Sequence, residues 1–389
     1  RDLTAEDFIM SDEVRAKVEA SANGLYDGTL YDNADDVMPT MEAKNGKKLA
    51  DLTGKAYDDP MWDELLDQLS FDDMATMINV GGWQTAQIDS VGKVGTSDCD
   101  GPAGLSNFIT GAYGTAYPSE VLMAMTWNKE MAYELGTSMG QEYADANNYG
   151  WYGPAMNTHR SAFAGRNFEY YSEDGVLAGL MASEEINGAS TKGVYPYIKH
   201  FAVNDQETNR CSFLLTYAHE QAIREIYLKP FETAVKNYTG TPLAVMSSFN
   251  FIGTVPSCGN NTLLNNVLRN EWGFVGMVET DYNGSYGYMN SERAVLNGND
   301  LMLGFGAAPS NQFVDADKPA VVAAMRQSCK NILYTIANSG YFTVVDPNAG
   351  GMDKLTKMMV TIDAIAGIAC VGLEALILAM FLKKKKAAK

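Results

Sequence analysis

Apolar residues recur every three to four positions in several long stretches of the chain, and short apolar runs separate these stretches. The first pattern indicates amphipathic helices, and the second indicates buried strands. Residues four apart share one face of a helix, as do Met131, Leu135, Met139 and Tyr143. Helices are predicted at Ala5–Ala22, Asn128–Ala146, Ser172–Asn187 with Ser172 as the N-cap, Ala218–Lys236, Thr262–Trp272 and Pro319–Asn338.

The strands predicted between these helices end in polar or charged residues. Alternating strands and helices are typical of a parallel sheet, whose strands carry functional side chains at their carboxyl ends. The predicted fold class is therefore α/β, a TIM-type (β/α)8 barrel with room for irregular strands. The strands and their polar ends are Trp151–Met156 with Asn157, His159 and Arg160, Tyr195–Ile198 with Lys199 and His200, Leu243–Phe249 with Asn250, and Phe274–Thr280 with Asp281.

The end of the chain carries a different pattern, a mostly apolar run at 358–382 followed by four lysines at 383–386. A bilayer core is crossed by about 20 residues, so the run predicts a C-terminal transmembrane helix. The positive-inside rule then puts the lysines in the cytoplasm and the barrel on the extracellular side of the cell membrane. Asp363 and Glu374 would each cost about 2.5–3.5 kcal/mol at the centre of a span, which leaves a buried or interfacial helix as the alternative.

These patterns divide the chain into five predicted segments. Residues 1–57 are acidic and rich in Asp, Asn and Gly, as in a linker or the remnant of an upstream domain. The barrel domain is expected at 58–345, a linker at 346–357, the membrane helix at 358–382 and a basic tail at 383–389.

Composition narrows the possible partners. The net charge of −19 and the pI of about 4.5 would repel a phosphate backbone, so nucleic acid is not expected as a partner. The five cysteines show no metal-binding spacing and are interpreted as isolated thiols, and the chain has only three histidines. Neither a metal nor an organic cofactor is predicted.

The richest polar cluster is the run Lys199-His-Phe-Ala-Val-Asn-Asp-Gln-Glu-Thr-Asn-Arg210. If Lys199, His200 and Arg166 surround Asp281, their positive charge favours an ionised carboxylate, which suits a nucleophile and not a general acid. Asp100, in a Gly-Pro turn, is suited to accept hydrogen bonds from neighbouring hydroxyls, although an Asp that merely starts a turn is an equal alternative.

Five strings of the sequence resemble, in order, the barrel domain of glycoside hydrolase family 3. The resemblance covers about residues 57–340 and implies a retaining hydrolase similar to β-glucosidases. It matches Asp281 to the catalytic nucleophile, matches Asp100, Arg166, Lys199 and His200 to groups that grip the sugar hydroxyls, and matches Arg210 to a supporting arginine. The strings are Asp100-Gly-Pro-Ala-Gly-Leu, Gly165-Arg-Asn-Phe-Glu-Tyr-Tyr-Ser-Glu-Asp, the run 199–210, Met246-Ser-Ser-Phe-Asn and Trp272-Gly-Phe-Val-Gly-Met-Val-Glu-Thr-Asp-Tyr.

Some positions depart from the family pattern. Tyr282, a predicted substrate contact, stands where a Trp usually follows the nucleophile; Ser106 stands where many members have Arg, and Phe249 where a Tyr is frequent. These departures leave the choice among glycosides open. The β-glucosidase branch takes its proton donor from a second α/β domain, so the resemblance implies an upstream domain as partner, in a member with inverted domain order.

Alternatives remain for several residues and for the function. Arg210 is interpreted first as part of an ion-pair network with Glu207, and Glu279 competes with Asp281 because it lies two positions away on the same strand. Lys199 could instead form a Schiff base in a lyase. A membrane-tethered sugar-binding barrel without independent activity is the non-enzymatic alternative.

Overall fold

The structure is a computed structural model. It describes residues 11–22, 28–212, 214–283, 288–305, 313, 317–344, 372 and 383. The chain divides into two units, 1–345 and 346–389. The first unit contains every strand and helix discussed below.

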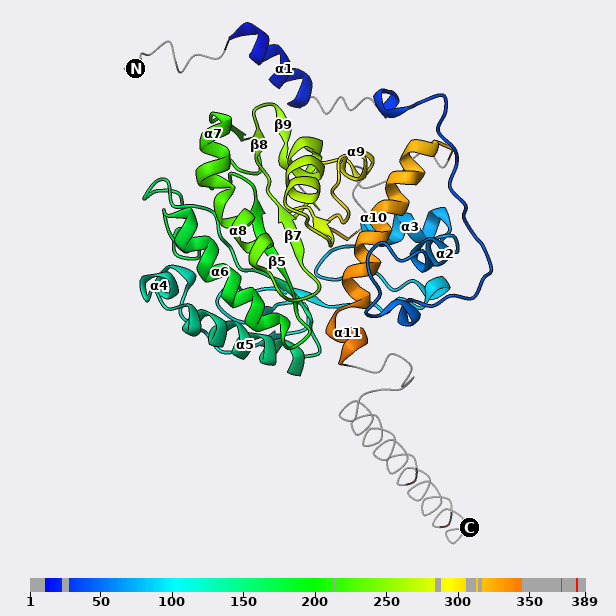
Figure 1. The fold of residues 1–389 in the computed structure, drawn as a ribbon, viewed down its shortest axis with the longest axis horizontal. Coiled ribbons are helices and arrows are strands. Elements are labelled where there is room, and N and C mark those ends of the chain that lie inside the picture. Colours follow the sequence, from blue (N-terminus) through cyan, green and yellow to red (C-terminus); the bar gives the residue numbers. More distant parts are fainter. Residues whose placement is uncertain are drawn as a thin grey trace. The chain divides into compact units, whose positions relative to one another are not determined.

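A central sheet forms the middle of this unit (Figure 1). Five of its strands run parallel, in the spatial order β10, β7, β5, β4, β1, and the short strands β2 and β3 continue the sheet as an antiparallel hairpin. The parallel arrangement predicted from the sequence is thus present. The strands are β1 (Asp98–Asp100), β2 (Ser106–Asn107), β3 (Ala112–Tyr113), β4 (Gly150–Tyr152), β5 (Tyr195–Phe201), β7 (Ala244–Ser247) and β10 (Val278–Glu279), with β6 (Leu215–Thr216), β8 (Phe251–Ile252) and β9 (Val255–Pro256) in a separate small sheet.

Backbone hydrogen bonds close the parallel strands into a ring. Beyond β10, Thr280 N donates to Leu301 O at 2.9 Å, and Met302 N donates to Ile78 O at 2.8 Å. The segment that begins at Ile78 returns to β1, because Asp98 N donates to Trp83 O at 2.9 Å. The architecture is therefore of barrel type, although some segments at strand positions of the ring are too short or irregular to count as strands.

The predicted fold class needs correction on the number of strands. In the described part of the chain, five parallel strands and two strand-like segments stand where eight regular strands were expected. One local reason is visible after β4: Gly153-Pro154 follows the strand at once, and a proline has no N–H to donate to a sheet ladder.

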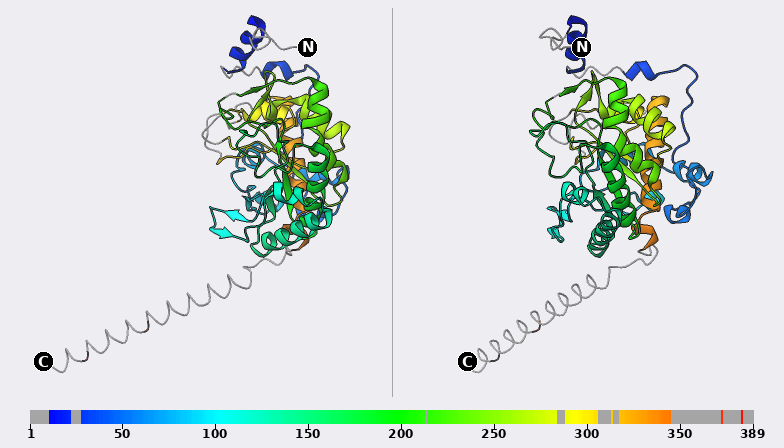
Figure 2. Two further views of the ribbon diagram at one scale, coloured as in Figure 1. Left: turned by 90° about the vertical axis from the view of Figure 1, so that its left-hand side faces the viewer. Right: turned by 60° about the vertical axis from the view of Figure 1, so that its left-hand side comes forward.

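Helices cover the outside of the sheet. On one flank α5, α6 and α8 lie side by side, and on another α10 packs against α2, α3, α9 and α11 (Figure 1). Figure 2 shows the same layers from two further directions. The helices are α1 (Asp12–Ala22), α2 (Met61–Leu66), α3 (Phe71–Asn79), α4 (Glu120–Met125), α5 (Lys129–Asp145), α6 (Gly175–Ser190), α7 (Glu220–Ala222), α8 (Lys229–Asn237), α9 (Ser291–Leu296), α10 (Pro319–Ala337) and α11 (Gly340–Thr343), and the short 3₁₀ or π-helical segments are η2 (Gly28–Tyr31), η3 (Leu49–Leu52), η4 (Asp89–Val91), η5 (Ile223–Tyr227), η6 (Ser257–Gly259) and η7 (Thr262–Glu271).

Several predicted helices match α5, η7 and α10 closely, and others differ in detail. The N-cap of α6 is Asp174 and not Ser172, because the Asp174 carboxylate accepts hydrogen bonds from two N–H groups of the first turn. The predicted helix at 218–236 is divided into α7, the π-helical η5 and α8, with Pro230 in the first turn of α8. Of the predicted helix at 5–22, residues 5–10 lie outside the described residues.

The predictions of a C-terminal transmembrane helix and of a cell-membrane location also need correction. Within the described residues, no helix combines the length and the apolar character needed to span a bilayer. The run at 358–382 lies outside those residues except for Gly372. The physical reason against a span is the pair of carboxylates at Asp363 and Glu374, each unfavourable in hydrocarbon. We therefore retain neither the membrane helix nor the membrane location.

Beneath the strand ends, a buried carboxyl group links β1 to β5. Asp98 on β1 is fully buried and accepts hydrogen bonds from the Tyr195 hydroxyl at 2.5 Å and the Tyr197 hydroxyl at 2.7 Å, both from β5. Tyr197 also packs edge-on against Tyr152 of β4, with ring centroids 4.9 Å apart. A polar group buried in this way is stable only while its partners remain.

Tyr197→Phe tests this bond. The variant leaves a buried carboxyl oxygen without its donor, so the free energy of unfolding should fall by about 1–3 kcal/mol. Tyr113→Phe is the control, because Tyr113 is 67% exposed. Urea denaturation followed by circular dichroism measures both variants. Equal midpoints for the two would show that the Asp98 contact adds nothing to stability.

Candidate active site

The carboxyl ends of the parallel strands gather most of the predicted site residues at one face, which we call the mouth. Asp100 is the last residue of β1, Lys199 and His200 lie near the end of β5, and Asp281 follows β10 by two residues. Arg166 and Arg210 stand in the loops after β4 and β5. The described contacts connect them into two groups, one around Asp281 and one around Asp100.

Asp281 is held from two sides. Its Oδ2 lies 3.3 Å from Arg210 Nη1 and 3.8 Å from His200 Nε2, and its Oδ1 accepts a hydrogen bond from the Tyr282 N–H at 2.7 Å. The Tyr288 hydroxyl donates to the Asp281 main-chain oxygen at 2.9 Å. These contacts fix the carboxylate next to a permanent positive charge.

The imidazole of His200 is neutral. Burial, followed by the charges of Arg166, Lys199 and Arg210, holds its pKa well below the usual 6.5. Arg166 Nη1 lies 3.0 Å from Nε2 and can only donate, so Nε2 is the acceptor and Nδ1 carries the proton. Nδ1 faces the Tyr170 hydroxyl at 3.4 Å. The tautomer is assigned from this network.

Asn157 fixes the main chain of His200. The His200 N–H donates to Asn157 Oδ1 at 2.8 Å, and Asn157 Nδ2 donates to the His200 main-chain oxygen at 2.9 Å. Asn157 is itself buried. One amide side chain thus pairs with both main-chain groups of this residue, so the imidazole projects from a fixed point of β5.

The second group surrounds Asp100. Its Oδ1 lies 3.6 Å from the buried Lys199 Nζ, and its Oδ2 accepts a hydrogen bond from the Trp83 indole N–H at 2.8 Å. The Asp100 side chain is 46% exposed, whereas that of Lys199 is 4% exposed. The Asp100 carboxylate is therefore open to solvent, whereas Lys199 lies buried next to it.

Two further carboxylates pair with the arginines of the mouth. Glu169 Oε1 lies 2.6 Å from Arg166 Nε, and Glu207 Oε2 lies 2.8 Å from Arg210 Nε. The ion pair expected between Arg210 and Glu207 is thus present. Arg210 also reaches Asp281, and its guanidinium lies 4.8 Å from the centre of the Phe249 ring, within cation–π range.

Glu279, the competitor for the role of nucleophile, has a different environment. It is fully buried, and burial together with the negative charges of Asp98, Asp100 and Asp281 raises its pKa well above the usual value. Burial therefore favours the protonated form of this carboxyl. A protonated, inaccessible carboxyl is a poor nucleophile.

Known proteins that resemble this chain bear on what such a mouth does. The model of the glycosyl hydrolase family 3 N-terminal domain matches residues 96–301, more than half of the chain. The chain belongs to glycoside hydrolase family 3. The matched range includes Asp100, Arg166, the run 199–210 and Asp281.

Individual family 3 relatives are longer than this chain. It is 38% identical to beta-glucosidase A of Butyrivibrio fibrisolvens over 67% of its own length and 31% of the relative's, and 34% identical to a beta-glucosidase of Rhizobium radiobacter over 72% and 35%. Among solved structures, beta-glucosidase 3B of Thermotoga neapolitana in complex with glucose has a TM-score of 0.64 at 33% identity, covering 76% of this chain and 45% of that one. A Paenibacillus barengoltzii beta-glucosidase has a TM-score of 0.69 at 29% identity, over 82% and 37%. The chain thus spans about a third of the curated relatives it matches.

Not every polar strand end of this family 3 domain contributes to the mouth. His159 Nε2 contacts the Tyr170 main-chain oxygen at 2.7 Å, and Asn250 Nδ2 donates to the Ala202 oxygen at 3.1 Å, so both have structural partners. Sequence reasoning missed Trp83. The strand pattern gave no signal for it, because the apolar residues before Trp83 belong to helix α3 and not to a strand.

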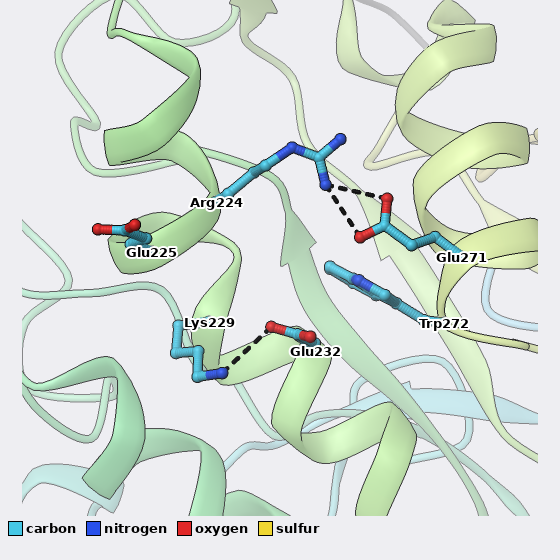
Figure 3. A pocket seen from close by; sticks show the side chains of 6 residues that line it. All are labelled: Arg224, Glu225, Lys229, Glu232, Glu271 and Trp272. Carbon is cyan, nitrogen blue, oxygen red and sulfur yellow. Dashed lines mark hydrogen bonds and ion pairs between the residues drawn. The ribbon is translucent and has the colours of Figure 1, made fainter.

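A surface pocket of about 240 Å³ lies apart from these residues, among η5, α8 and η7 (Figure 3). Most of its charges pair with one another: Arg224 contacts Glu271 at 3.0 Å, and Lys229 contacts Glu232 at 3.2 Å. Glu225, which also lines the pocket, accepts a hydrogen bond from Gln221 Nε2 at 3.2 Å. The lining is therefore largely compensated by its own ion pairs. In the described ranges, no group of three or more potential ligating side chains is arranged to hold a metal ion.

The buried imidazole leads to a prediction about pH. Because the folded-state pKa of His200 is depressed, the unfolded chain takes up a proton below about 6.5 that the folded chain does not. The contribution of this residue to stability is complete above that pH and is lost as the pH falls. The ring C–H signals of His200, assigned with His200→Gln, should stay constant in NMR spectra from pH 8 to about 5.5. A titration midpoint near 6.5 would contradict the neutral, buried assignment.

Proposed function

We propose that this domain is the sugar-binding and nucleophile-bearing part of a retaining, exo-acting glycosidase. Its substrate would be a terminal β-D-glucosyl or related β-glycosyl residue. The observation that carries the proposal is the fixed, ion-paired carboxylate of Asp281 at the mouth, near the exposed carboxylate of Asp100. The glucose-bound Thermotoga relative supports a glucosyl ligand.

The proposed chemistry starts with the attack of Asp281 on the anomeric carbon. The C–O bond to the leaving group breaks, a covalent glycosyl–Asp281 intermediate forms, and water then hydrolyses it with retention of configuration. Asp100, Lys199, His200 and Arg166 would bind the hydroxyls of the sugar, and Tyr282 would contact it beside the nucleophile. Arg210 supports the nucleophile through its contact with Oδ2. Contacts that become stronger as charge develops on the sugar ring stabilise the transition state of the reaction more than the bound substrate.

The leaving oxygen also needs a proton. Asp100, Glu169 and Glu207 at the mouth are each engaged in an ion pair with a cation. We place the acid/base on an upstream α/β domain, outside the barrel domain at 58–345. Support comes from the greater length of the relatives.

Lyase chemistry at Lys199 is not favoured. A Schiff base needs a neutral, free amine, whereas Lys199 Nζ is buried as the ion-pair partner of Asp100. A sugar-binding barrel without activity differs from the proposal only in what Asp281 does, and covalent labelling separates the two.

Labelling with dinitrophenyl 2-fluoroglucoside tests the nucleophile. The activated leaving group needs no proton, so the chain should acquire one fluoroglucosyl group at Asp281, seen by mass spectrometry. Asp281→Asn should not be labelled, because an amide cannot attack. Glu279→Gln, two residues away, is the matched control and should be labelled at no less than about a tenth of the wild-type rate. Labelling of Asp281→Asn but not of Glu279→Gln would reverse the assignment.

The leaving group tests where the acid lies. The isolated chain should form the intermediate readily from a dinitrophenyl glucoside, giving a burst followed by slow turnover, because deglycosylation needs a base. Cellobiose should react about 10²–10⁴-fold more slowly than with a complete enzyme, the usual contribution of general acid catalysis. Stopped-flow absorbance and a glucose assay measure the two reactions.

Turnover of cellobiose by residues 1–389 at about 1–10³ per second would overturn the missing-acid proposal. Asp205 would then be the first residue to replace. It lies in the loop after β5, is 8% exposed, and burial raises its pKa to about 7. Asp205→Asn would abolish that turnover if the acid were internal.

A further inference from the structure

Trp83 contacts the mouth through the polar edge of its ring. The indole N–H donates to Asp100 Oδ2 at 2.8 Å, while Lys199 Nζ is 3.6 Å from the other carboxylate oxygen. The hydrogen bond from the neutral indole is thus shorter than the ion-pair contact with Lys199. Because an indole N–H can only donate, the bond also fixes which way the carboxylate is turned.

The main chain holds Trp83 in an unfavourable conformation at this position. Its φ is +53°, in the left-handed region that bulky residues rarely adopt. The neighbouring Gly82 allows the close approach that this requires, because a Cβ there would lie 2.8 Å from Gly304 O. The Trp83 carbonyl in turn accepts from the Asp98 N–H at 2.9 Å. Such conformations persist where the surroundings determine them.

Aromatic neighbours restrict the ring. Phe108 packs edge-on with centroids 4.9 Å apart, Phe305 stacks at 5.8 Å, and Tyr282 lies at 5.6 Å. Phe108 and Phe305 are 58% and 56% exposed, so they form the outer layer and Trp83 the inner one. The ring is therefore held on more than one side with its N–H directed at Asp100.

The strand next to Asp100 offers no cation at the matching position. Ser106 of β2 is the register partner of Asp100, and directly opposed residues have their Cβ atoms about 4.5–5.5 Å apart. A serine there is too short and uncharged to replace the indole as the orienting group. The orientation of the carboxylate thus depends on Trp83 and Lys199.

We propose that Trp83 is a positioning residue for Asp100. Its indole N–H turns the carboxylate so that the remaining lone pairs face the hydroxyl of the bound sugar. The proposal rests on the proposed function insofar as the ligand is a glycoside. The hydrogen bond itself is independent of any ligand, so the two ideas can fail separately.

The bond is tested without sugar. With ¹⁵N-labelled tryptophan, the five indole N–H signals are resolved by NMR, and Trp83→Phe assigns one of them. Asp100→Ala removes the acceptor, so it should shift that signal and speed its exchange with water by about tenfold or more, whereas the Trp62 signal should not move. An unchanged Trp83 signal in Asp100→Ala would overturn the proposal.

The function of the bond is tested by calorimetric titration of the full chain with glucose and the monodeoxyglucoses. Trp83→Phe should weaken glucose binding about tenfold, and Asp100→Asn at least as much. The deoxy sugar that lacks the hydroxyl bound by Asp100 should lose nothing further in either variant. A merely structural role of Trp83 would weaken all sugars alike.

Trp62→Phe is the matched control, because it removes a buried indole N–H that donates to Ala56 O, and it should bind as the wild type does. Equal behaviour of the two Trp→Phe variants would overturn the positioning role. If the wild type bound no glucose, the proposed function would fail, while the NMR result would still decide the bond.

Discussion

The imidazole of His200 lies among the cations Arg166, Lys199 and Arg210, and burial keeps it from becoming a fourth positive charge. The neutral ring orients Arg166, because His200 Nε2 can accept the hydrogen bond from Arg166 only while it carries no proton. A protonated ring would repel all three cations and remove that acceptor at once. The arrangement of the mouth on the side of Asp281 therefore depends on one group that stays uncharged.

The remaining charges of the mouth are nearly balanced among themselves. Four carboxylates, Asp100, Glu169, Glu207 and Asp281, pair with three cations, and Arg210 is shared by Glu207 and Asp281. Buried ion pairs are stable when further hydrogen bonds satisfy the remaining donors and acceptors. The Tyr282 N–H on Asp281 and the Trp83 N–H on Asp100 have this role. Neutral N–H donors thus complement the salt bridges at both aspartates.

The sequence predicted the parts of this arrangement that depend on local periodicity. Strands followed by polar residues indicated parallel β4, β5, β7 and β10 with Lys199, His200 and Asp281 at one face, and the structure has them there. Ring closure was not predictable in detail, because it depends on main-chain bonds between segments far apart in sequence, such as Met302 and Ile78. The break of the helix at 218–236 reflects a π-helical turn that hydrophobic spacing does not encode. The apolar run at 358–382 was predicted to span a membrane from its length and hydropathy, although it contains Asp363 and Glu374, and that prediction is not retained.

Side-chain roles were harder to predict than positions. Nothing in the residue type of Trp83 marks it as a partner of Asp100, because the bond exists only through the left-handed turn and the close approach of Gly82. Arg210 was expected to brace Glu207, and the structure adds a second contact with Asp281. Residues that act through a neighbour thus become visible only when the chain is folded.

The electrostatics of the mouth also explain why a nucleophile and an acid would be separated. A nucleophilic carboxylate must be ionised, and Asp281 lies beside the permanent charge of Arg210. A general acid must keep its proton near neutral pH, which requires burial or negative neighbours. Within the barrel, the carboxyls in such surroundings include Glu279, which lies fully buried beneath the mouth. The proposed donor on another domain would meet both requirements, because it would reach the leaving oxygen from outside the field of the three cations.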